Sequence, residues 1–251
     1  MNTALKHPVA SRDDWLEQRR ALLAREKVLT RLGDEIARER RALPRVRVDK
    51  TYTFETPAGP RALAELFDGR RQLMVQHFML APGWDEGCKS CSFMADHLPG
   101  ALVHLQHRDV TLVLVSRATL PEIERFRARM GWPMTWVSAN ANDFNQDFHV
   151  SFSEADRVDG EVDYNYHRTA FPQVEAPGIS VFCKDDAGDV FHAYSTYGRG
   201  VEAMMGTYDL LDLTPGGRGE DGDAYGMQWV RHHDRYADAP AAASSCCAAR
   251  A

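Results

Sequence analysis

The sequence predicts an α/β fold preceded by a long N-terminal helix, and three observations support this prediction. Two nearly continuous apolar runs, RQLMVQHFML at 71–80 and DVTLVLVSR at 109–117, are typical of strands buried on both faces of a parallel sheet. Segments with a helical pattern alternate with these runs, as they do in βαβ units. Near the N-terminus, apolar residues recur every seven positions, which indicates an amphipathic helix.

The N-terminal helix is predicted to begin at Ser11 and to end before Pro44. Ser11 and Asp14 form a capping box, in which both side chains accept hydrogen bonds from backbone N–H groups at the helix start. One apolar row follows the helix: Trp15, Leu22, Leu29, Ile36 and Leu43. We expect residues 1–45 to form a helical arm, which either lies on its own domain or binds the arm of a second copy in a homodimer.

The remaining pattern predicts one domain over 46–236, followed by a disordered tail over 237–251 that holds Cys246 and Cys247. The Gly-rich segment 214–226 neither follows a strand nor opens a helix, so we expect a surface loop there. The predicted elements are a strand and turn at 47–60, a helix at 61–69, a strand at 71–80, a helix at 92–108, a strand at 109–117, a helix at 119–132, a strand at 134–139, an irregular insertion at 142–178, a hairpin at 179–195 and a helix at 200–213.

Composition narrows the classes of partner. The chain has a formal net charge of −6, whereas nucleic acids and anionic membranes favour a basic surface, so we expect neither as a partner. No apolar stretch approaches the roughly 20 residues that span a bilayer, and the N-terminus has no secretory pattern, so we expect a cytoplasmic protein. Five cysteines without regular spacing do not indicate a secreted disulfide framework.

Cys88 and Cys91 lie between the first buried strand and a predicted helix. A cysteine in the first turn of a helix meets unsatisfied N–H groups and the positive end of the helix dipole, which stabilise its thiolate. Cys88 is therefore the predicted nucleophile, Lys89 adds a positive charge beside it, and Cys91 is placed to resolve a mixed disulfide. This predicts a dithiol–disulfide oxidoreductase that needs no cofactor and acts on a protein or small-molecule disulfide.

Two other classes of function remain open. The same cysteines, together with His77, could hold copper, zinc or iron, although a structural zinc site needs four ligands and the local sequence has no second Cys-x-x-Cys pair. A non-catalytic interaction module is the third class.

Several longer motifs show a resemblance to a known family. They are HPVASRDDWLEQRRALLAREK, HFMLAPGWDEGCKSCSFMADH, YSTYGRG, TYDLLDLTP and WVRHHDRY. Together they resemble a bacterial thioredoxin-like family catalogued as a domain of unknown function, number eight-nine-nine, over residues 7–236. The resemblance implies a thioredoxin-like fold, with a central mixed sheet flanked by helices, and a dithiol–disulfide activity.

The thioredoxin pattern also assigns roles to individual residues. His77 stands where a buried acid is usual, and the resemblance implies that it moves the proton of Cys91, unless it is a core histidine. Pro177 occupies the position of a cis-proline beside the cysteines, unless it is a plain turn proline. Trp84 lies near the usual aromatic position before the cysteine helix, so it is either a substrate contact or a core residue. Asp85 stands where peroxiredoxins carry Thr, which makes a peroxidase the weaker thiol hypothesis.

Two polar motifs complete the candidate site. Tyr194, Tyr197 and Arg199 could line a substrate pocket or tie a loop to a helix. His232 and His233 could bind substrate near the thiols, or belong to a structural surface segment.

Overall fold

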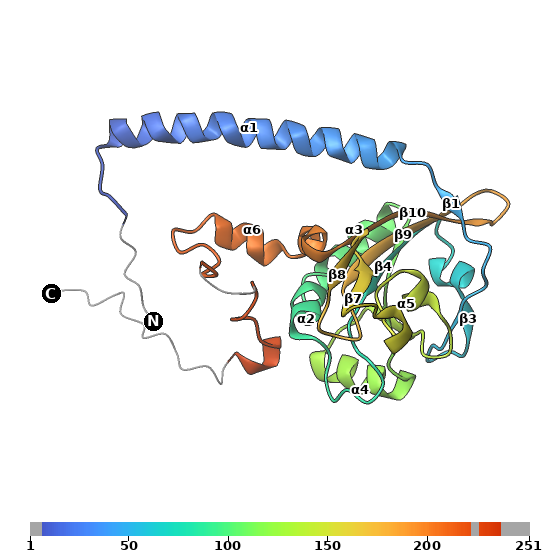
Figure 1. Ribbon diagram of the computed structural model, residues 1–251. Coiled ribbons are helices and arrows are strands. Elements are labelled where there is room, and N and C mark those ends of the chain that lie inside the picture. The colour runs from blue at the N-terminus through green and yellow to red at the C-terminus, as the bar shows by residue number, and fades with distance from the viewer. Residues whose placement is uncertain (1–6, 222–225, 237–251) are drawn as a thin grey trace. The chain divides into compact units, whose positions relative to one another are not determined.

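A long helix and a mixed sheet are the main parts of the computed structural model, which describes residues 7–221 and 226–236 (Figure 1). The chain divides between Arg45 and Val46 into two compact units. The predicted tail at 237–251, with Cys246 and Cys247, lies outside the described residues. No helix in the described ranges is long and apolar enough to cross a membrane.

The first unit contains helix α1, Arg12–Ala42, which begins where the capping box predicts. The Ser11 hydroxyl accepts a hydrogen bond from the backbone N–H of Asp14 at 3.1 Å. Acidic residues in the first turn and basic residues in the last turn both complement the helix dipole. The helix ends at Leu43, directly before Pro44, and none of its residues is buried.

The second unit is built on a six-stranded sheet with the order β1-β10-β9-β4-β5-β6. Strands β4, β5 and β6 are parallel, whereas β9 is antiparallel to β4 and β10 to β9. This mixed sheet flanked by helices is a thioredoxin-like fold, as predicted. The strands of the sheet are β1 (Val46–Arg47), β4 (Gln72–His77), β5 (Val110–Ser116), β6 (Thr135–Ser138), β9 (Gly178–Lys184) and β10 (Val190–Tyr197).

The helices depart from the predicted spans at three points. The span 61–69 begins as a strand, Arg61–Ala62, and continues as a 3-10 helix, Leu63–Phe67. The span 92–108 is interrupted before Pro99, and the span 200–213 is interrupted at Met205. Proline lacks a backbone N–H, so it starts a new helical segment here rather than continuing the previous one. The α-helices of this unit are α2 (Lys89–Ala95), α3 (Leu102–His107), α4 (Leu120–Met130), α5 (Phe144–Asp147) and α6 (Gly206–Asp212). The 3-10 helices are η1 (Leu63–Phe67), η2 (Pro99–Ala101), η3 (Glu154–Asp156), η4 (Gly198–Met204) and η5 (His233–Arg235).

The insertion predicted as irregular contains a hairpin of its own. Strands β7 (Glu161–Tyr164) and β8 (His167–Ala170) pair antiparallel, apart from the main sheet. A second small pair is formed by β2 (Thr53–Phe54) and β3 (Arg61–Ala62). Tyr164 at the end of β7 packs with Phe152 and Tyr197, so the insertion is attached to the end of β10 through an apolar cluster.

Alternation along β4 divides the core into two faces. Leu73 and Val75 lie in the cluster that also holds η1 and Phe144 of α5. Phe78, on the opposite face, lies in the cluster that contains Cys91 of α2 and Phe126 of α4. Successive side chains of a strand point to opposite faces, so residues of β4 with even numbers face α2 and those with odd numbers face away from it.

Candidate functional site

Cys88 occupies the N-cap position of helix α2, directly after the loop that follows β4. Its backbone N–H donates to the carbonyl of Met79 at 3.0 Å, and its carbonyl accepts from the N–H of Ser92 at 2.9 Å. The preceding residue must be small, because a Cβ added at Gly87 would lie 2.5 Å from a ring carbon of Phe78. The sequence therefore places Cys88 where the loop after a strand meets the start of a helix.

The two thiols have opposite pKa shifts. The pKa of Cys88 falls from 9.0 to about 6, chiefly because Cys91 donates a hydrogen bond to its thiolate. Burial of Cys88 opposes this shift, while N–H groups of Cys91 and Ser90 and the hydroxyl of Ser90 support it. The same hydrogen bond, together with burial and the adjacent negative charge, raises the pKa of Cys91 well above its ordinary value. Cys88 is half-buried and Cys91 is only 1% exposed, so only Cys88 is both ionised at neutral pH and accessible.

Gln76 is a residue of this site that sequence analysis missed. It is fully buried in β4, and its Nε2 donates to the backbone carbonyl of Cys91 at 3.2 Å. Within the described part of the chain, its Oε1 has no hydrogen-bond partner. Alternation along the strand indicates this position, because Gln76 is two residues before Phe78 and so lies on the same face of the strand, the face that packs against α2.

His77 lies on the other face of the sheet, so the role assigned to it beside the thiols is corrected. Its ring stacks on that of Phe144 with a centroid separation of 5.6 Å, and its Nε2 is 2.8 Å from the hydroxyl of Ser180. Burial lowers its pKa from 6.5 to about 3, so it is neutral at ordinary pH. Cys88 and Cys91 therefore lack the ligand that the metal hypothesis took from His77. Among the residues that the structure describes, no group of at least three His, Cys, Asp or Glu side chains could hold a metal ion.

A cavity of about 1000 Å³ opens in front of the cysteines. Cys88, Ser90 and Cys91 line one side of it. The insertion contributes Tyr164 and Phe171. The described part of the Gly-rich segment is a surface loop of turns, as predicted, and it also lines the cavity through residues 216–221 and Gly226. Further lining residues are the one that precedes β9 and several in η4, in α6 and between them: Pro177, Gly198, Arg199, Val201, Glu202, Met205, Tyr208 and Asp212.

Pro177 lies at the cavity, as the thioredoxin pattern implied, but its peptide bond is not cis. The described residues contain no cis peptide bond. The carbonyl of Pro177 instead accepts a hydrogen bond from the Tyr164 hydroxyl at 2.8 Å, and the same hydroxyl accepts from the N–H of Gly198 at 2.9 Å. Tyr164 thus joins the start of β9 to the start of η4 beside the thiols.

Charged groups on the far wall of the cavity are paired with one another. Arg199 contacts both carboxylate oxygens of Glu202, at 2.7 and 3.2 Å. Arg218 contacts both oxygens of Asp212, at 2.8 and 2.7 Å, and donates to Glu202 at 3.1 Å. Its guanidinium carbon also lies 3.9 Å from the ring centroid of Tyr208.

Glu220 ties the Gly-rich segment to α6. One of its carboxylate oxygens accepts from the Tyr208 hydroxyl at 2.8 Å, from Trp229 Nε1 at 2.8 Å and from the N–H of Met227 at 2.7 Å. Burial alone would raise the pKa of Glu220, but the hydrogen bonds from Met227, Tyr208 and Trp229 hold that pKa below its ordinary value. Glu220 therefore remains a carboxylate and fixes the shape of this wall.

Of the aromatic residues predicted to contact substrate, none lines the described cavity. Trp84 packs against the core cluster that includes Phe78. Tyr197 is buried, and its hydroxyl donates to the carbonyl of Phe148 at 3.0 Å. Its ring also lies where a Cβ at residue 178 would be, 2.7 Å away, so Gly178 is required there. Tyr194 is half-buried on β10, opposite Val181 of β9. Arg199 alone among the predicted residues of the YSTYGRG motif reaches the cavity.

The WVRHHDRY motif holds the loop before Cys88 in place rather than lining the cavity. His232 is buried, and its Nε2 donates to the carbonyl of Gly87 at 2.9 Å. His233 Nδ1 lies 2.6 Å from the carboxylate of Asp96, at the end of α2. His232 therefore contacts the loop before α2, His233 contacts the end of α2, and neither histidine lines the cavity.

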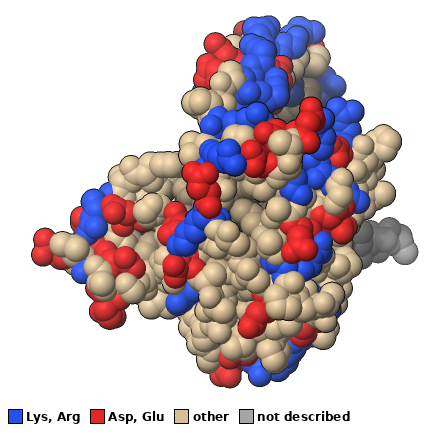
Figure 2. Space-filling model, turned by 90° about the vertical axis from the view of Figure 1, so that its right-hand side faces the viewer, with Lys and Arg blue, Asp and Glu red and all other residues tan. Residues whose placement is uncertain are grey.

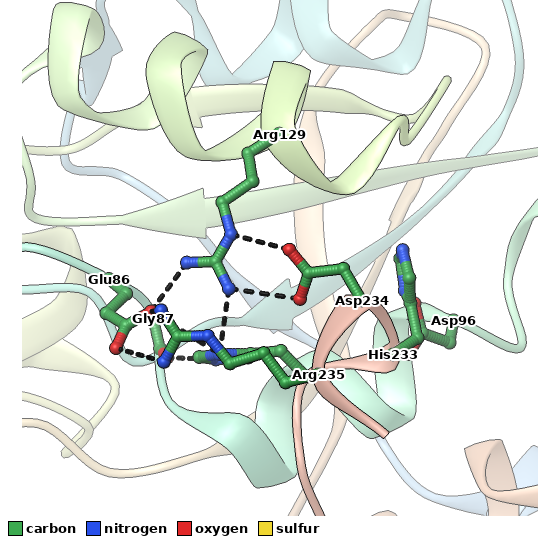
Figure 3. A network of polar contacts seen from close by, with 8 residues as sticks. Glu86, Gly87, Asp96, Arg129, His233, Asp234 and Arg235 are labelled. Carbon is green, nitrogen blue, oxygen red and sulfur yellow. Dashed lines mark hydrogen bonds and ion pairs between the residues drawn. The ribbon is translucent and has the colours of Figure 1, made fainter. Parts of the chain in front are cut away.

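Ion pairs extend this network to helix α4 (Figure 3). Arg129 binds both oxygens of Asp234, at 2.8 and 3.0 Å, and contacts Glu86 at 2.5 Å. Arg235 donates to Glu86 at 2.9 Å. Because Glu86 directly precedes Gly87, the C-terminal segment and α4 together hold the loop that leads to Cys88.

Comparisons with known proteins found a family and several distantly similar structures. No curated protein matches the chain. Peroxiredoxin Q of Xanthomonas campestris has a similar structure, with a TM-score of 0.42 and 11% identity over 62% of this chain and 87% of that chain. Peroxidoxin BcpB of Mycobacterium tuberculosis is similar at a TM-score of 0.40 and 12% identity, over 64% of this chain and 96% of that chain. At these identities the likeness concerns the fold alone. Residues 4–236 match the sequence profile of a family described as bacterial protein of unknown function (DUF899), and the chain therefore belongs to that family.

Proposed function

We propose that this protein is a thioredoxin-like dithiol–disulfide oxidoreductase in which Cys88 attacks and Cys91 resolves. The observation that supports the proposal is the contrast between the two thiols at the cavity. Cys88 has a pKa of about 6 and is accessible, whereas Cys91 is buried and its pKa is raised. A nucleophile needs its thiolate at working pH, and a resolving thiol must stay protonated until the mixed disulfide has formed.

The reaction has two exchange steps. The Cys88 thiolate attacks one sulfur of the substrate disulfide, the substrate S–S bond breaks, and one substrate thiolate leaves and takes a proton from solvent. Cys91 then loses its proton and attacks the sulfur of Cys88, which releases the second substrate thiol. The protein is left with a Cys88–Cys91 disulfide, and a thiol reductant must return it to the dithiol.

Loss of the Cys88 thiolate in the first step makes Cys91 easier to ionise for the second step. Once Cys88 is in a mixed disulfide, its negative charge is lost, and with it one of the causes that keep the pKa of Cys91 high. Gln76, which donates to the carbonyl of Cys91, holds that residue in the first turn of α2 during this exchange.

Serine variants test the order of attack. With a small disulfide substrate, Cys88→Ser is expected to abolish turnover. Cys91→Ser is expected to stop after one exchange and to accumulate the mixed disulfide at Cys88, detected by intact-protein mass spectrometry. Cys183→Ser, on β9 outside the cavity lining, is the control and should turn over at the wild-type rate. Turnover by Cys88→Ser, or a trapped adduct on Cys91, would disprove the assignment.

We further propose that the protein works in the cytoplasm, where thiol reductants can regenerate the dithiol. Fractionation of cells, with trapping of thiols before lysis, should find the protein in the cytoplasmic fraction with the Cys88–Cys91 pair largely reduced. Recovery outside that fraction would contradict the placement.

A further inference from the structure

The cavity in front of Cys88 indicates which class of disulfide it accepts, an inference that rests on the proposed function. Part of its lining is apolar and rich in sulfur, formed by Met79, Met94, Met205 and Met227. Three of them, Met79, Met94 and Met205, are at most 7% exposed. Methionine side chains are flexible and polarisable, and they adapt to apolar and aromatic ligands of varied shape.

Aromatic residues continue this apolar surface on the side of the insertion. Tyr164 and Phe171 line the cavity, with their ring centroids 5.0 Å apart. The Tyr164 hydroxyl is already engaged by Pro177 and Gly198, so its ring rather than its polar end is offered to a ligand. Val201 of η4, which is 3% exposed, lies among the apolar lining residues as well.

Charge in the cavity disfavours an anionic substrate. The lining carries two arginines and four carboxylates: Arg199, Arg218, Glu202, Asp212, Glu220 and Asp221. Each arginine already makes a two-oxygen contact with a carboxylate of the same wall. A substrate carboxylate would therefore meet paired cations, surplus negative charge and the Cys88 thiolate, and like charges in a partly desolvated site repel strongly.

The volume suits a small molecule. At about 1000 Å³ the cavity lies at the upper end of the range typical of sites for drug-sized ligands. We propose that the substrate is a low-mass, uncharged and largely apolar or aromatic disulfide, rather than an anionic one such as oxidised glutathione or a disulfide in a folded protein.

Two disulfides with the same dipyridyl framework, one of which carries two added carboxylates, provide the main test. The full-length protein, reduced and freed of reductant, is mixed with neutral dithiodipyridine or with its dicarboxylate analogue, dithiodinicotinic acid. Each rate is divided by the rate of N-acetylcysteine with the same disulfide at the same pH, which removes intrinsic reactivity. We expect the normalised rate constant for the neutral compound to exceed that for the dicarboxylate by about tenfold or more. Oxidised glutathione and insulin should react more slowly than the neutral compound on the same normalised scale.

A charge variant tests whether the cavity wall causes the preference. Glu202→Gln removes one carboxylate that is shared by Arg199 and Arg218, so the normalised rate with the dicarboxylate should rise by at least about threefold relative to the neutral compound. Glu154→Gln is the matched control, because Glu154 is exposed on η3 and does not line the cavity, and it should leave the ratio unchanged.

The outcomes separate the two proposals. If no disulfide reacts with Cys88 faster than with N-acetylcysteine, the oxidoreductase proposal itself fails. If disulfides react but the dicarboxylate, oxidised glutathione or insulin is preferred, the oxidoreductase proposal stands and the substrate class is overturned. If Glu202→Gln and Glu154→Gln change the preference for the neutral disulfide equally, the charges of the cavity wall are not its cause.

Discussion

At the scale of single residues, the site depends on a difference between two chemically identical side chains. Cys88 and Cys91 are three positions apart, yet the N-cap position exposes one to the cavity and the first turn of α2 buries the other. A hydrogen bond between them stabilises the thiolate of Cys88 and disfavours that of Cys91. In the proposed mechanism, this difference alone assigns the roles of nucleophile and resolving thiol to the two cysteines.

The pH dependence of Cys88 alkylation tests this difference. The pKa of Cys88 lies at about 6, below its ordinary value of 9.0, so its reaction with iodoacetamide should be half-maximal near pH 6 and reach a plateau above it. Cys91→Ala removes the largest cause of the shift and should move the midpoint upward. Ser90→Ala removes a smaller cause and should move it less. A midpoint that Cys91→Ala leaves in place would contradict the hydrogen bond as the cause.

Residue roles were predictable only where local sequence determines them. The position of Cys88 at a helix start follows from the strand and helix patterns beside it, and both are local. The role of His77 does not, because RQLMVQHFML is nearly apolar throughout and lacks the alternation that would show which residues share a face. The structure places Gln76, one position earlier, against Cys91 and turns His77 to the other side.

At the scale of secondary-structure elements, β4 carries a buried histidine whose ionisation affects stability. The folded-state pKa of His77 is about 3, below its ordinary value of 6.5, so the unfolded chain binds the proton more readily. The stabilising contribution of neutral His77 is therefore complete above pH 6.5 and is lost as the pH falls from 6.5 toward 3. The loss is about 1.4 kcal/mol of unfolding free energy for each pH unit in that window.

Urea unfolding across this pH window measures the effect. The unfolding free energy of the wild type should fall more steeply between pH 6.5 and pH 4 than that of His77→Gln, which cannot take up the proton. His167→Gln, an exposed position on β8, serves as the control and should keep the wild-type slope. Equal slopes for wild type and His77→Gln would refute the linkage.

The C-terminal segment acts as a second element of the site, through contacts over more than 100 positions. Asp234→Asn weakens the two-oxygen contact with Arg129, and we expect it to lower the unfolding free energy by about 1 kcal/mol or less, since the pair is partly exposed. Amide hydrogen exchange over 226–236 and at Gly87 should become faster, because His232 is then held less firmly. Asp209→Asn, on the exposed side of α6, is the control. Unchanged exchange at Gly87 would show that the segment does not support the loop.

Elements with a local pattern were predictable from the sequence, and elements held by contacts with distant residues were not. The strands β4, β5 and β6 and the helices α1 and α4 follow from continuous patterns and from caps such as Ser11 and Thr119. The WVRHHDRY motif has no such pattern, and its partners Glu86, Asp96 and Arg129 are known only once the chain has folded. The sequence therefore identified the motif as polar and notable but could not locate it.

At the scale of the whole molecule, the central sheet and α2 hold the cysteine pair, and segments outside the sheet form most of the cavity wall. The insertion, η4, α6 and the Gly-rich segment all contribute lining residues, although none of them belongs to the central parallel strands. Acidic and basic side chains are interspersed on the face that Figure 2 shows, with uncharged residues between them. The fold class was predictable from apolar periodicity, whereas the cavity was not, because it requires segments far apart in sequence to meet.

The division of the chain into two units leads to a prediction for assembly. The unit from Val46 onward has its own core, so a protein lacking residues 1–45 should fold and should keep the disulfide reactivity of Cys88. No residue of α1 is buried, yet Trp15, Leu22, Leu29, Ile36 and Leu43 form an apolar row along it. We propose that this row binds the same row of a second copy, since an apolar helix stripe is stabilised when it is removed from water.

Light scattering decides between a paired and an unpaired arm. The full-length protein should have the mass of a dimer, and the protein lacking residues 1–45 should have that of a monomer. Leu29→Glu places a charge within the row and should shift the full-length protein toward monomer. Ala24→Glu adds the same charge two positions after Leu22, about 200° around the helix from the row, and should leave the dimer intact. If the full-length and shortened proteins have the same number of chains per particle, pairing through α1 is excluded.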